Sequence, residues 1–152
     1  MRRLFNKILH NEMRLNKDIV VITADLGYKM FDLIKTDYPD RFINVGASEQ
    51  TMMDMAVGVA LQGKLPICYT ISPFYSRAFE TIRNYLLHEG IKVIMIGSGR
   101  GKDYLHDGFS HWDDYNNYCG DFSFFPDDEQ EMILNFKTAI TCKKPCYINL
   151  KR

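Results

Sequence analysis

The stretch RFINVGASEQTMMDMAVGVALQG, residues 41–63, decides the fold that the sequence predicts. The apolar run 42–45 has the length of a strand, and Gly46 offers a turn after it. Ser48 can then cap a helix, because its hydroxyl can accept from a free backbone N–H of the first turn. Apolar and small residues recur at helical spacing as far as Gly63, which ends the helix: Met52, Met55, Ala56, Val59 and Ala60. Open α/β sheets bind ligands where a strand turns into such a helix, and here the first turn presents Glu49 rather than the glycines and lysine of a phosphate loop.

The same alternation of strand and helix patterns continues along the chain. The sequence predicts helices over 2–14, 30–37, 48–61, 72–86 and 126–140, and strands over 19–23, 42–45, 67–70, 92–96, 122–125 and 147–150. A glycine-rich loop is predicted over 97–111, followed by a short helix over 112–118. This pattern predicts an α/β fold with a doubly wound, mainly parallel six-stranded sheet, helices on both faces and a single domain covering 1–152.

Composition excludes several classes of function. Apolar residues make up 46% of the 152 residues, and Lys+Arg and Asp+Glu are balanced at 19 each, so no net field attracts nucleic acid or an anionic membrane. No apolar run approaches the ~20 residues of a membrane span, and the first ten residues lack the apolar core of a signal peptide. The four cysteines have no zinc-ligand spacing and are expected to be free thiols, which favours a cytoplasmic location.

Several segments resemble the pyrimidine-binding domain of transketolases. The resemblance is strongest in DRFINVGASEQTMMDMAVGVALQGKLP and extends from DIVVITADLG through SPFYSRAFETIRN and HDGFSH to PCYINLKR. In that family the Glu of the E-Q pair binds a ring nitrogen of the aminopyrimidine of thiamin diphosphate and promotes ionisation of the cofactor. The resemblance therefore implies a catalytic and cofactor-binding role for Glu49. From its position alone, Glu49 could equally be an acid that the helix dipole favours in a first turn.

The resemblance implies further roles in other segments. Phe74 matches an aromatic residue that stacks on the pyrimidine ring, and Asp25 in A-D-L-G matches an Asp near the cofactor. Asp107-Gly-Phe-Ser-His111 resembles the D-G-P-T-H segment, in which the Asp contacts a sugar hydroxyl of the substrate and the His lies near the cofactor's imino group. The residue patterns alone leave simpler alternatives open, namely a core Phe, a turn Asp, and a loop Asp and His that bond their own backbone. Phe109 replaces the usual Pro of the last segment.

One departure from the family pattern concerns the substrate. Transketolases carry a His near the donor's carbonyl end several residues before the D-G-P-T-H segment, where this chain has Gly99 followed by Arg100. An Arg in this neighbourhood resembles 1-deoxyxylulose-5-phosphate synthase, in which it contacts a substrate phosphate. A guanidinium suits a bidentate phosphate contact, so we expect Arg100 to bind substrate, with a solvated loop residue as the alternative.

Family enzymes hold Mg²⁺ and the diphosphate through a separate domain with a G-D-G…N motif, whose hard oxygen ligands suit that ion. This sequence lacks the motif and the family's C-terminal domain, so no metal site is expected on the chain itself. The resemblance implies the pyrimidine-binding subunit of a split enzyme that transfers a two-carbon ketol unit from a ketose or ketose phosphate to an aldehyde. A separately encoded diphosphate-binding subunit would hold Mg²⁺ and the cofactor's diphosphate, in a two-plus-two heterotetramer. The alternatives are a subunit of a two-component 2-oxoacid decarboxylase, a deoxyxylulose-phosphate-synthase-like enzyme, and a non-catalytic regulatory subunit.

Overall fold

The apolar runs of the sequence form one parallel sheet. The computed structural model describes residues 1–113 and 117–152, and within these ranges six strands pair in the order β2-β1-β3-β4-β6-β5, with every pair parallel. The strands are β1 (Ile19–Thr23), β2 (Phe42–Asn44), β3 (Leu65–Ile71), β4 (Ile94–Ser98), β5 (Ser123–Phe124) and β6 (Cys146–Leu150). Every residue of β1, β4 and β6 is buried, because helices cover both faces of the sheet. The predicted doubly wound α/β fold is confirmed.

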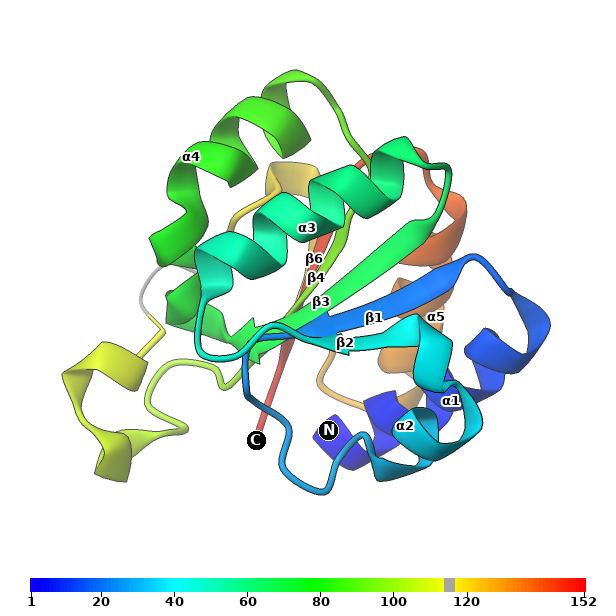
Figure 1. Cartoon of the computed structure of the whole chain (residues 1–152). Helices are drawn as coiled ribbons and strands as arrows, with labels where there is room; N and C mark the ends of the chain where they lie inside the picture. Colours follow the sequence, from blue (N-terminus) through cyan, green and yellow to red (C-terminus); the bar gives the residue numbers. More distant parts are fainter. Residues whose placement is uncertain (114–116) are drawn as a thin grey trace.

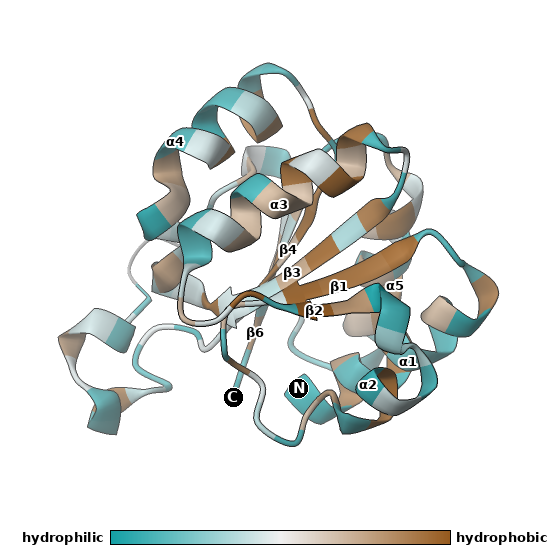
Figure 2. Cartoon of the chain, in the orientation of Figure 1, coloured by the Kyte–Doolittle hydropathy of each residue, from teal (hydrophilic) through white to brown (hydrophobic). Residues whose placement is uncertain are grey.

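Helices lie on both faces of the sheet (Figure 1), and two hydrophobic clusters hold them there. Helices α1 (Arg2–Leu15), α2 (Asp32–Asp37) and α5 (Glu129–Thr141) pack on one face. Helix α3 (Glu49–Leu61) and the helical segment 72–88 pack on the other. In Figure 2 the strands at the centre of the sheet are largely apolar, whereas the helices that cover them combine apolar and polar residues. No helix among the described residues is long and apolar enough to cross a membrane.

The segment 72–88 differs from the regular helix that the sequence predicts. It consists of a 3-10 stretch (Ser72–Ala78), one α-helical turn labelled α4 (Phe79–Thr81) and a π-helical stretch (Ile82–His88). Its buried side chains Tyr75, Ile82 and Leu86 still face the sheet. The i+4 spacing predicts a buried face of Phe74, Ala78, Ile82 and Leu86. The last three are buried, but Tyr75 is buried in place of Phe74, which is half-buried, because the first turns are wound as a 3-10 helix.

Other boundaries shift by a few residues. Strand β4 begins two residues later than predicted, because its register is set by the pairing of Ile94 with Ile67 in β3. The predicted strand 122–125 is reduced to β5, a two-residue edge strand. The loop 97–111 contains two short 3-10 turns, at Leu105–Asp107 and Phe109–His111. The short helix predicted over 112–118 falls partly outside the described residues.

Candidate functional site

The candidate site lies where strands β1, β3 and β4 end and the chain turns towards the helices. Strands β2 and β3 flank β1 on opposite sides, so their connections diverge at this edge, which is the switch point where open sheets bind ligands. Helix α3 begins here. Gly46 supplies the turn with a φ of +79°, and the Ser48 hydroxyl accepts from Thr51 N–H at 3.4 Å, as predicted. These local features place Glu49 at the first position of α3.

Glu49 is a buried acid whose two oxygens both have a donor. Glu49 is only 3% exposed to solvent. Oε2 accepts from Nη1 of Arg77 at 2.8 Å, and Oε1 accepts from Oγ1 of Thr70 at 3.3 Å. Thr70 comes from β3 and Arg77 from the 3-10 stretch that follows it. The carboxylate is thus fixed in orientation by side chains of its own chain.

Arg77 links Glu49 to the aromatic residues of the site. Its guanidinium carbon lies 3.9 Å from the centroid of the Phe74 ring, within the range of a cation–π contact. The ring of Phe74 in turn meets the ring of His111 edge-on, with centroids 4.9 Å apart. Glu49, Arg77, Phe74 and His111 therefore form a continuous row, which we call the carboxylate–aromatic row. The structure brings together three of the residues that the sequence predicts for the site and adds Arg77.

A buried polar network anchors the loop that carries His111. Asn149, the penultimate residue of β6, is fully buried, and its amide nitrogen lies 2.8 Å from Oδ2 of Asp113 and 3.1 Å from the carbonyl oxygen of Gly99. The two ends of the loop are thereby held against the same strand. Asp107 lies between them on an exposed 3-10 turn, four residues before His111. This position leaves its carboxylate available to a ligand at the edge of the site.

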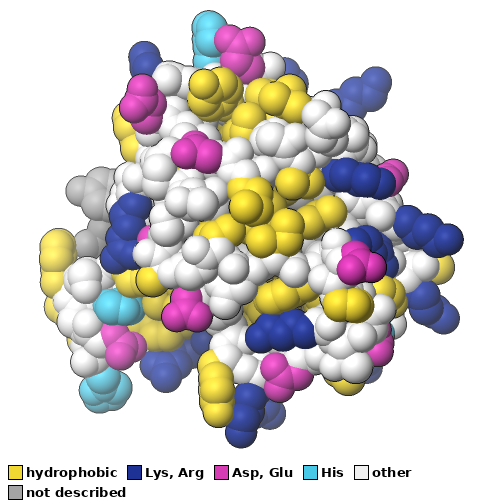
Figure 3. Space-filling model, in the orientation of Figure 1, with side chains coloured by type: hydrophobic (Ala, Val, Ile, Leu, Met, Phe, Trp, Pro, Cys, Tyr) yellow, Lys and Arg dark blue, Asp and Glu magenta, His cyan; other side chains and the backbone are white. Residues whose placement is uncertain are grey.

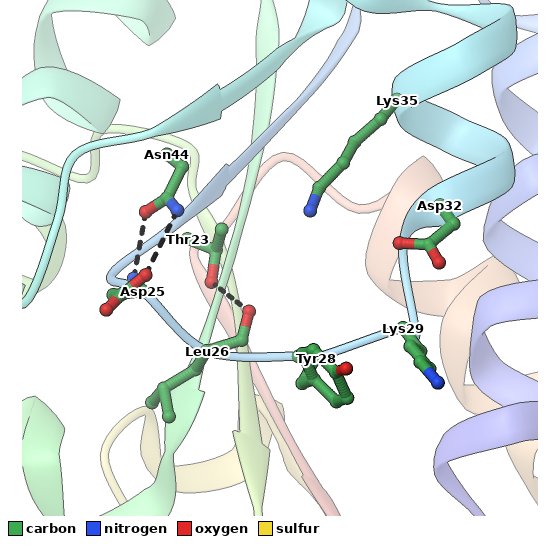
Figure 4. Close-up of a pocket in the computed structure, with 9 residues that line it drawn as sticks. Thr23, Asp25, Leu26, Tyr28, Lys29, Asp32, Lys35 and Asn44 are labelled. Atoms are coloured by element: carbon green, nitrogen blue, oxygen red, sulfur yellow. Dashed lines mark hydrogen bonds between the residues drawn. The ribbon is translucent and has the colours of Figure 1, made fainter.

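Asp25 lies in a separate pocket, at the ends of β1 and β2 (Figure 4). This pocket has a volume of about 380 Å³ and is also lined by Asn44, Lys35 and Lys29. Asp25 adopts a left-handed φ of +56°, and its backbone N–H donates to Oδ1 of Asn44 at 2.9 Å. Among the described residues, no contact joins Asp25 to the carboxylate–aromatic row.

Arg100 is engaged away from the row. Its Nε donates to Oδ1 of Asn149 at 2.9 Å, its Nη2 donates to the Asn149 carbonyl at 2.9 Å, and its Nη1 pairs with Asp127 at 2.7 Å. Its side chain is 19% exposed. The guanidinium therefore ties the end of β6 to Asp127, just before α5. Nε, Nη1 and Nη2 of Arg100 each have an acceptor within the chain, so its orientation is set by these partners.

Sequence reasoning missed Arg77, although a signal was present. Arg77 follows Phe74 by three residues, and residues three apart share one face of a helical segment. Arg77 therefore shares a face with Phe74, the predicted stacking ring. This position makes it a candidate partner for both Phe74 and the predicted acid Glu49.

The chemistry of the row suits a planar nitrogen heterocycle. A buried carboxylate can bind a ring nitrogen or an amino group, and the half-buried Phe74 offers a ring for stacking. By contrast, no group of three or more His, Cys, Asp or Glu side chains in residues 1–113 and 117–152 is placed to hold a metal ion. Fold and site together define an open α/β domain whose candidate ligand site lies at the switch point of a parallel sheet.

Comparison with known proteins specifies the family. The model of the transketolase pyrimidine-binding domain matches residues 1–113, and the chain belongs to this family. It is 29% identical to a Methanocaldococcus jannaschii protein provisionally named as a transketolase C-terminal section, over all of this chain and 50% of that protein. It is 27% identical to human transketolase, over 99% of this chain and 25% of the human protein.

Solved structures agree with this assignment. A protein described as a split-gene transketolase, in the form of an inactive β4 tetramer, superposes with a TM-score of 0.82 at 29% identity, over 99% of this chain and 51% of that chain. Transketolase from Campylobacter jejuni superposes with a TM-score of 0.85 at 20% identity, over 99% of this chain and 25% of that one, which supports the fold. The chain spans half or less of the length of the curated relatives described here.

Proposed function

We propose that this chain is the pyrimidine-binding subunit of a split thiamin diphosphate-dependent, transketolase-like enzyme. The enzyme would transfer a two-carbon ketol unit from a ketose or ketose phosphate to an aldehyde. The observation that carries this proposal is the position of Glu49, a buried carboxylate at the first turn of α3, beside a stacking ring and a histidine. Family membership supports the cofactor class, and the split-gene relative of similar fold supports the division into subunits.

The residues of the row fit the pyrimidine half of the cofactor. Glu49 would bind a ring nitrogen and Phe74 would stack on the ring, with Asp25 as a further contact at the neighbouring strand ends. When bound, thiamin diphosphate supplies a carbon nucleophile and an electron sink for breaking a carbon–carbon bond next to a carbonyl group.

The chain's own residues would position the pyrimidine and hold the proton that Glu49 shares with its ring nitrogen. Thr70 keeps an oxygen of Glu49 in a fixed direction, and burial keeps water from competing for the carboxylate. Glu49 would then share a proton with the ring nitrogen that it binds. His111 lies at the edge of Phe74, where it could donate to or accept from a reacting group, and Asp107 would bind a hydroxyl of the sugar.

A partner subunit would complete the site. It would hold Mg²⁺ and the diphosphate, for which hard oxygen ligands are required. Apolar side chains gather over α3 and the segment that follows β3 (Figure 3). The large exposed ones are Met55, Leu61, Phe79, Tyr85 and Leu87. An apolar surface of this kind supports chain–chain contacts, and we propose a two-plus-two heterotetramer.

Two observations favour a second candidate, a subunit of a deoxyxylulose-phosphate-synthase-like enzyme. The 1-deoxy-D-xylulose-5-phosphate synthase of Dehalococcoides mccartyi is 28% identical over 99% of this chain and 24% of that protein. Gly99-Arg100 also departs from the transketolase pattern in the direction of that enzyme. The two candidates differ in the donor, which is a ketose for the first and a 2-oxoacid for the second.

Reconstitution tests the proposal. The chain would be co-expressed with a subunit that carries the G-D-G…N motif and assayed with thiamin diphosphate, Mg²⁺ and an aldehyde acceptor. One series would use ketose phosphate donors and the other pyruvate. We expect ketol transfer from a ketose by the complex and no full activity from the chain alone. Turnover with pyruvate only would favour the second candidate.

The variant Glu49→Gln tests the role of the chain in catalysis. We expect a loss of at least about 100-fold in turnover of the complex, because the amide cannot share a proton with the ring. Glu80→Gln is the matched control, since Glu80 is an exposed acid on α4, and it should retain full activity. Full activity of Glu49→Gln would instead indicate a regulatory subunit.

A further inference from the structure

Two cysteines and a lysine meet at the edge of the sheet opposite the candidate site. Cys142 is the C-cap of α5, and Cys146 is the first residue of β6. Their sulfur atoms lie 3.0 Å apart. Nζ of Lys92 lies 3.3 Å from Sγ of Cys142 and 3.4 Å from Sγ of Cys146. Backbone carbonyls hold this ammonium in place, because Nζ also donates to the oxygens of Ala139 at 2.5 Å and Lys144 at 2.7 Å.

The two thiols differ in accessibility and acidity. Cys142 is partly exposed, whereas Cys146 is fully buried. Burial opposes ionisation of Cys142, but the hydrogen bond with Cys146, a backbone hydrogen bond at Lys144 and the charge of Lys92 outweigh it and lower the pKa of Cys142. Burial, reinforced by the hydrogen bond with Cys142, raises the pKa of Cys146 to about 12. One sulfur is thus suited to attack first, and the other is held within reach to attack second.

We propose that Cys142 and Cys146 form a redox site that closes to an intramolecular disulfide by exchange with a low-molecular-weight disulfide. The pair differs in this respect from Cys68 and Cys119, which are buried and have no sulfur within hydrogen-bond distance among the described residues. The inference does not depend on the proposed ketol transfer, since it uses neither the carboxylate–aromatic row nor the partner subunit.

The exchange is balanced in two steps. The Cys142 thiolate attacks one sulfur of the small disulfide, which breaks the S–S bond, forms a mixed disulfide at Cys142 and releases one small thiolate. Cys146 then gives its proton to the small thiolate released in the first step and attacks the sulfur of Cys142, which breaks the mixed disulfide, forms the protein disulfide and releases the second small thiolate. The two protein thiols lose two electrons in total, and the small disulfide gains them. Lys92 stabilises the thiolate at each step, because its ammonium contacts both sulfurs.

The exchange should be reversible. An S–S bond is about 2.05 Å long, so the sulfurs need to approach by about 1 Å only. The bridge closes a ring of few residues, Cys142 to Cys146, so it restricts the unfolded chain little and adds little stability. Cys142 is also partly exposed, so a reducing thiol can reach the bridge.

Peptide mapping after exchange under native conditions tests the proposal. The full chain would be incubated with glutathione disulfide and glutathione at several ratios, quenched in acid, alkylated and digested with trypsin. Trypsin cleaves after Lys143 but not between Lys144 and Pro145, so Cys142 and Cys146 fall in different peptides, 138–143 and 144–151. We expect these two peptides to be joined by a disulfide in the oxidised sample, separate after reduction, with Cys68 and Cys119 alkylated throughout.

Variants distinguish the two roles. Cys146→Ser should stop at a glutathione adduct on Cys142, whereas Cys142→Ser should leave Cys146 unreacted because that sulfur is buried. Cys68→Ser is the matched control and should form the linked peptide like the natural chain. A stable glutathione adduct without linked peptides in the natural chain would overturn the proposal, as would equal reactivity of all four cysteines. Linkage of either sulfur to Lys92 would also overturn it.

Discussion

The contact between Arg77 and Glu49 allows a quantitative test of how the buried acid is held. The acid is 3% exposed and accepts its shortest hydrogen bond, 2.8 Å, from Arg77. Arg77→Ala would leave Glu49 with one remaining hydrogen bond, from Thr70 at 3.3 Å. We expect the folded chain to lose stability, because a buried carboxylate would then be incompletely compensated.

The loss of stability expected for Arg77→Ala depends on how deeply Glu49 and Arg77 are each buried. Removing one partner of a fully buried ion pair costs about 3–5 kcal/mol, and an exposed pair contributes about 0–1 kcal/mol. Glu49 belongs to the first class, but the Arg77 side chain is 52% exposed, so water can replace part of its contact. We therefore expect about 2 kcal/mol for the pair and a further ~0.5–1 kcal/mol for the cation–π contact with Phe74.

A double-mutant cycle in urea at 25 °C measures this contribution. Arg77→Ala should cost about 2–3 kcal/mol in the natural chain, and about 1 kcal/mol in a Glu49→Gln background, where the ion pair no longer exists. Arg83→Ala is the matched control, because Arg83 is exposed and hydrogen-bonds to its neighbour Asn84; its effect should stay within about 0.5 kcal/mol. Equal costs of Arg77→Ala in the two backgrounds would refute the reasoning.

Further predictions concern the core, the stacking ring and the redox site. Gly97→Ala should lower the free energy of unfolding by about 1–3 kcal/mol in urea titrations, because the new methyl group would lie within 3 Å of the buried side chains of Tyr147 and Ser72; a loss below 0.5 kcal/mol would contradict this packing. Phe74→Ala should weaken thiamin diphosphate binding by the reconstituted complex about two- to tenfold in calorimetric titrations, since an aromatic contact contributes about 0.5–1.5 kcal/mol; unchanged affinity would argue against stacking. Alkylation of Cys142 by iodoacetamide should continue to lower pH than alkylation of an unstructured cysteine, because the thiolate reacts and the pKa of Cys142 is lowered; a rate profile shifted to higher pH would contradict this.

The sequence predicted those parts of the fold that local chemistry determines. The buried strand 19–23 and the capped start of α3 at Ser48 both lie where they were expected. Sequence patterns do not determine strand limits that depend on pairing with a distant segment. The predicted strand 92–96 is compatible with several strand limits, and the pairing with β3 selects Ile94 as the first residue. The π-helical stretch 82–88 has no distinctive composition, so only packing on the sheet could reveal it.

In the candidate site, too, local sequence predicts some residues, whereas contacts between distant segments decide the position of others. Glu49, Phe74 and His111 could be predicted because each lies in a segment that resembles the family, and the parallel sheet brings the ends of those segments to one edge. The position of Arg100 could not be predicted. Its partners Asn149 and Asp127 come from β6 and the start of α5, and nothing near Arg100 in the sequence indicates that they would engage its guanidinium.

If the site is shared with a partner subunit, as proposed, Arg77 explains how this chain can hold its part of the site before the partner binds. A buried acid without a donor would destabilise the free subunit, and the proposed pyrimidine is not yet there to supply one. Arg77 meets this need, since it donates to Oε2 of Glu49 and covers the ring of Phe74, the same two groups that the pyrimidine would use. Its side chain is half exposed, so it can move into solvent when the pyrimidine enters and supplies new contacts to Glu49 and Phe74. On the proposed function, Arg77 therefore stabilises the unassembled subunit and must yield its two contacts before the cofactor can bind.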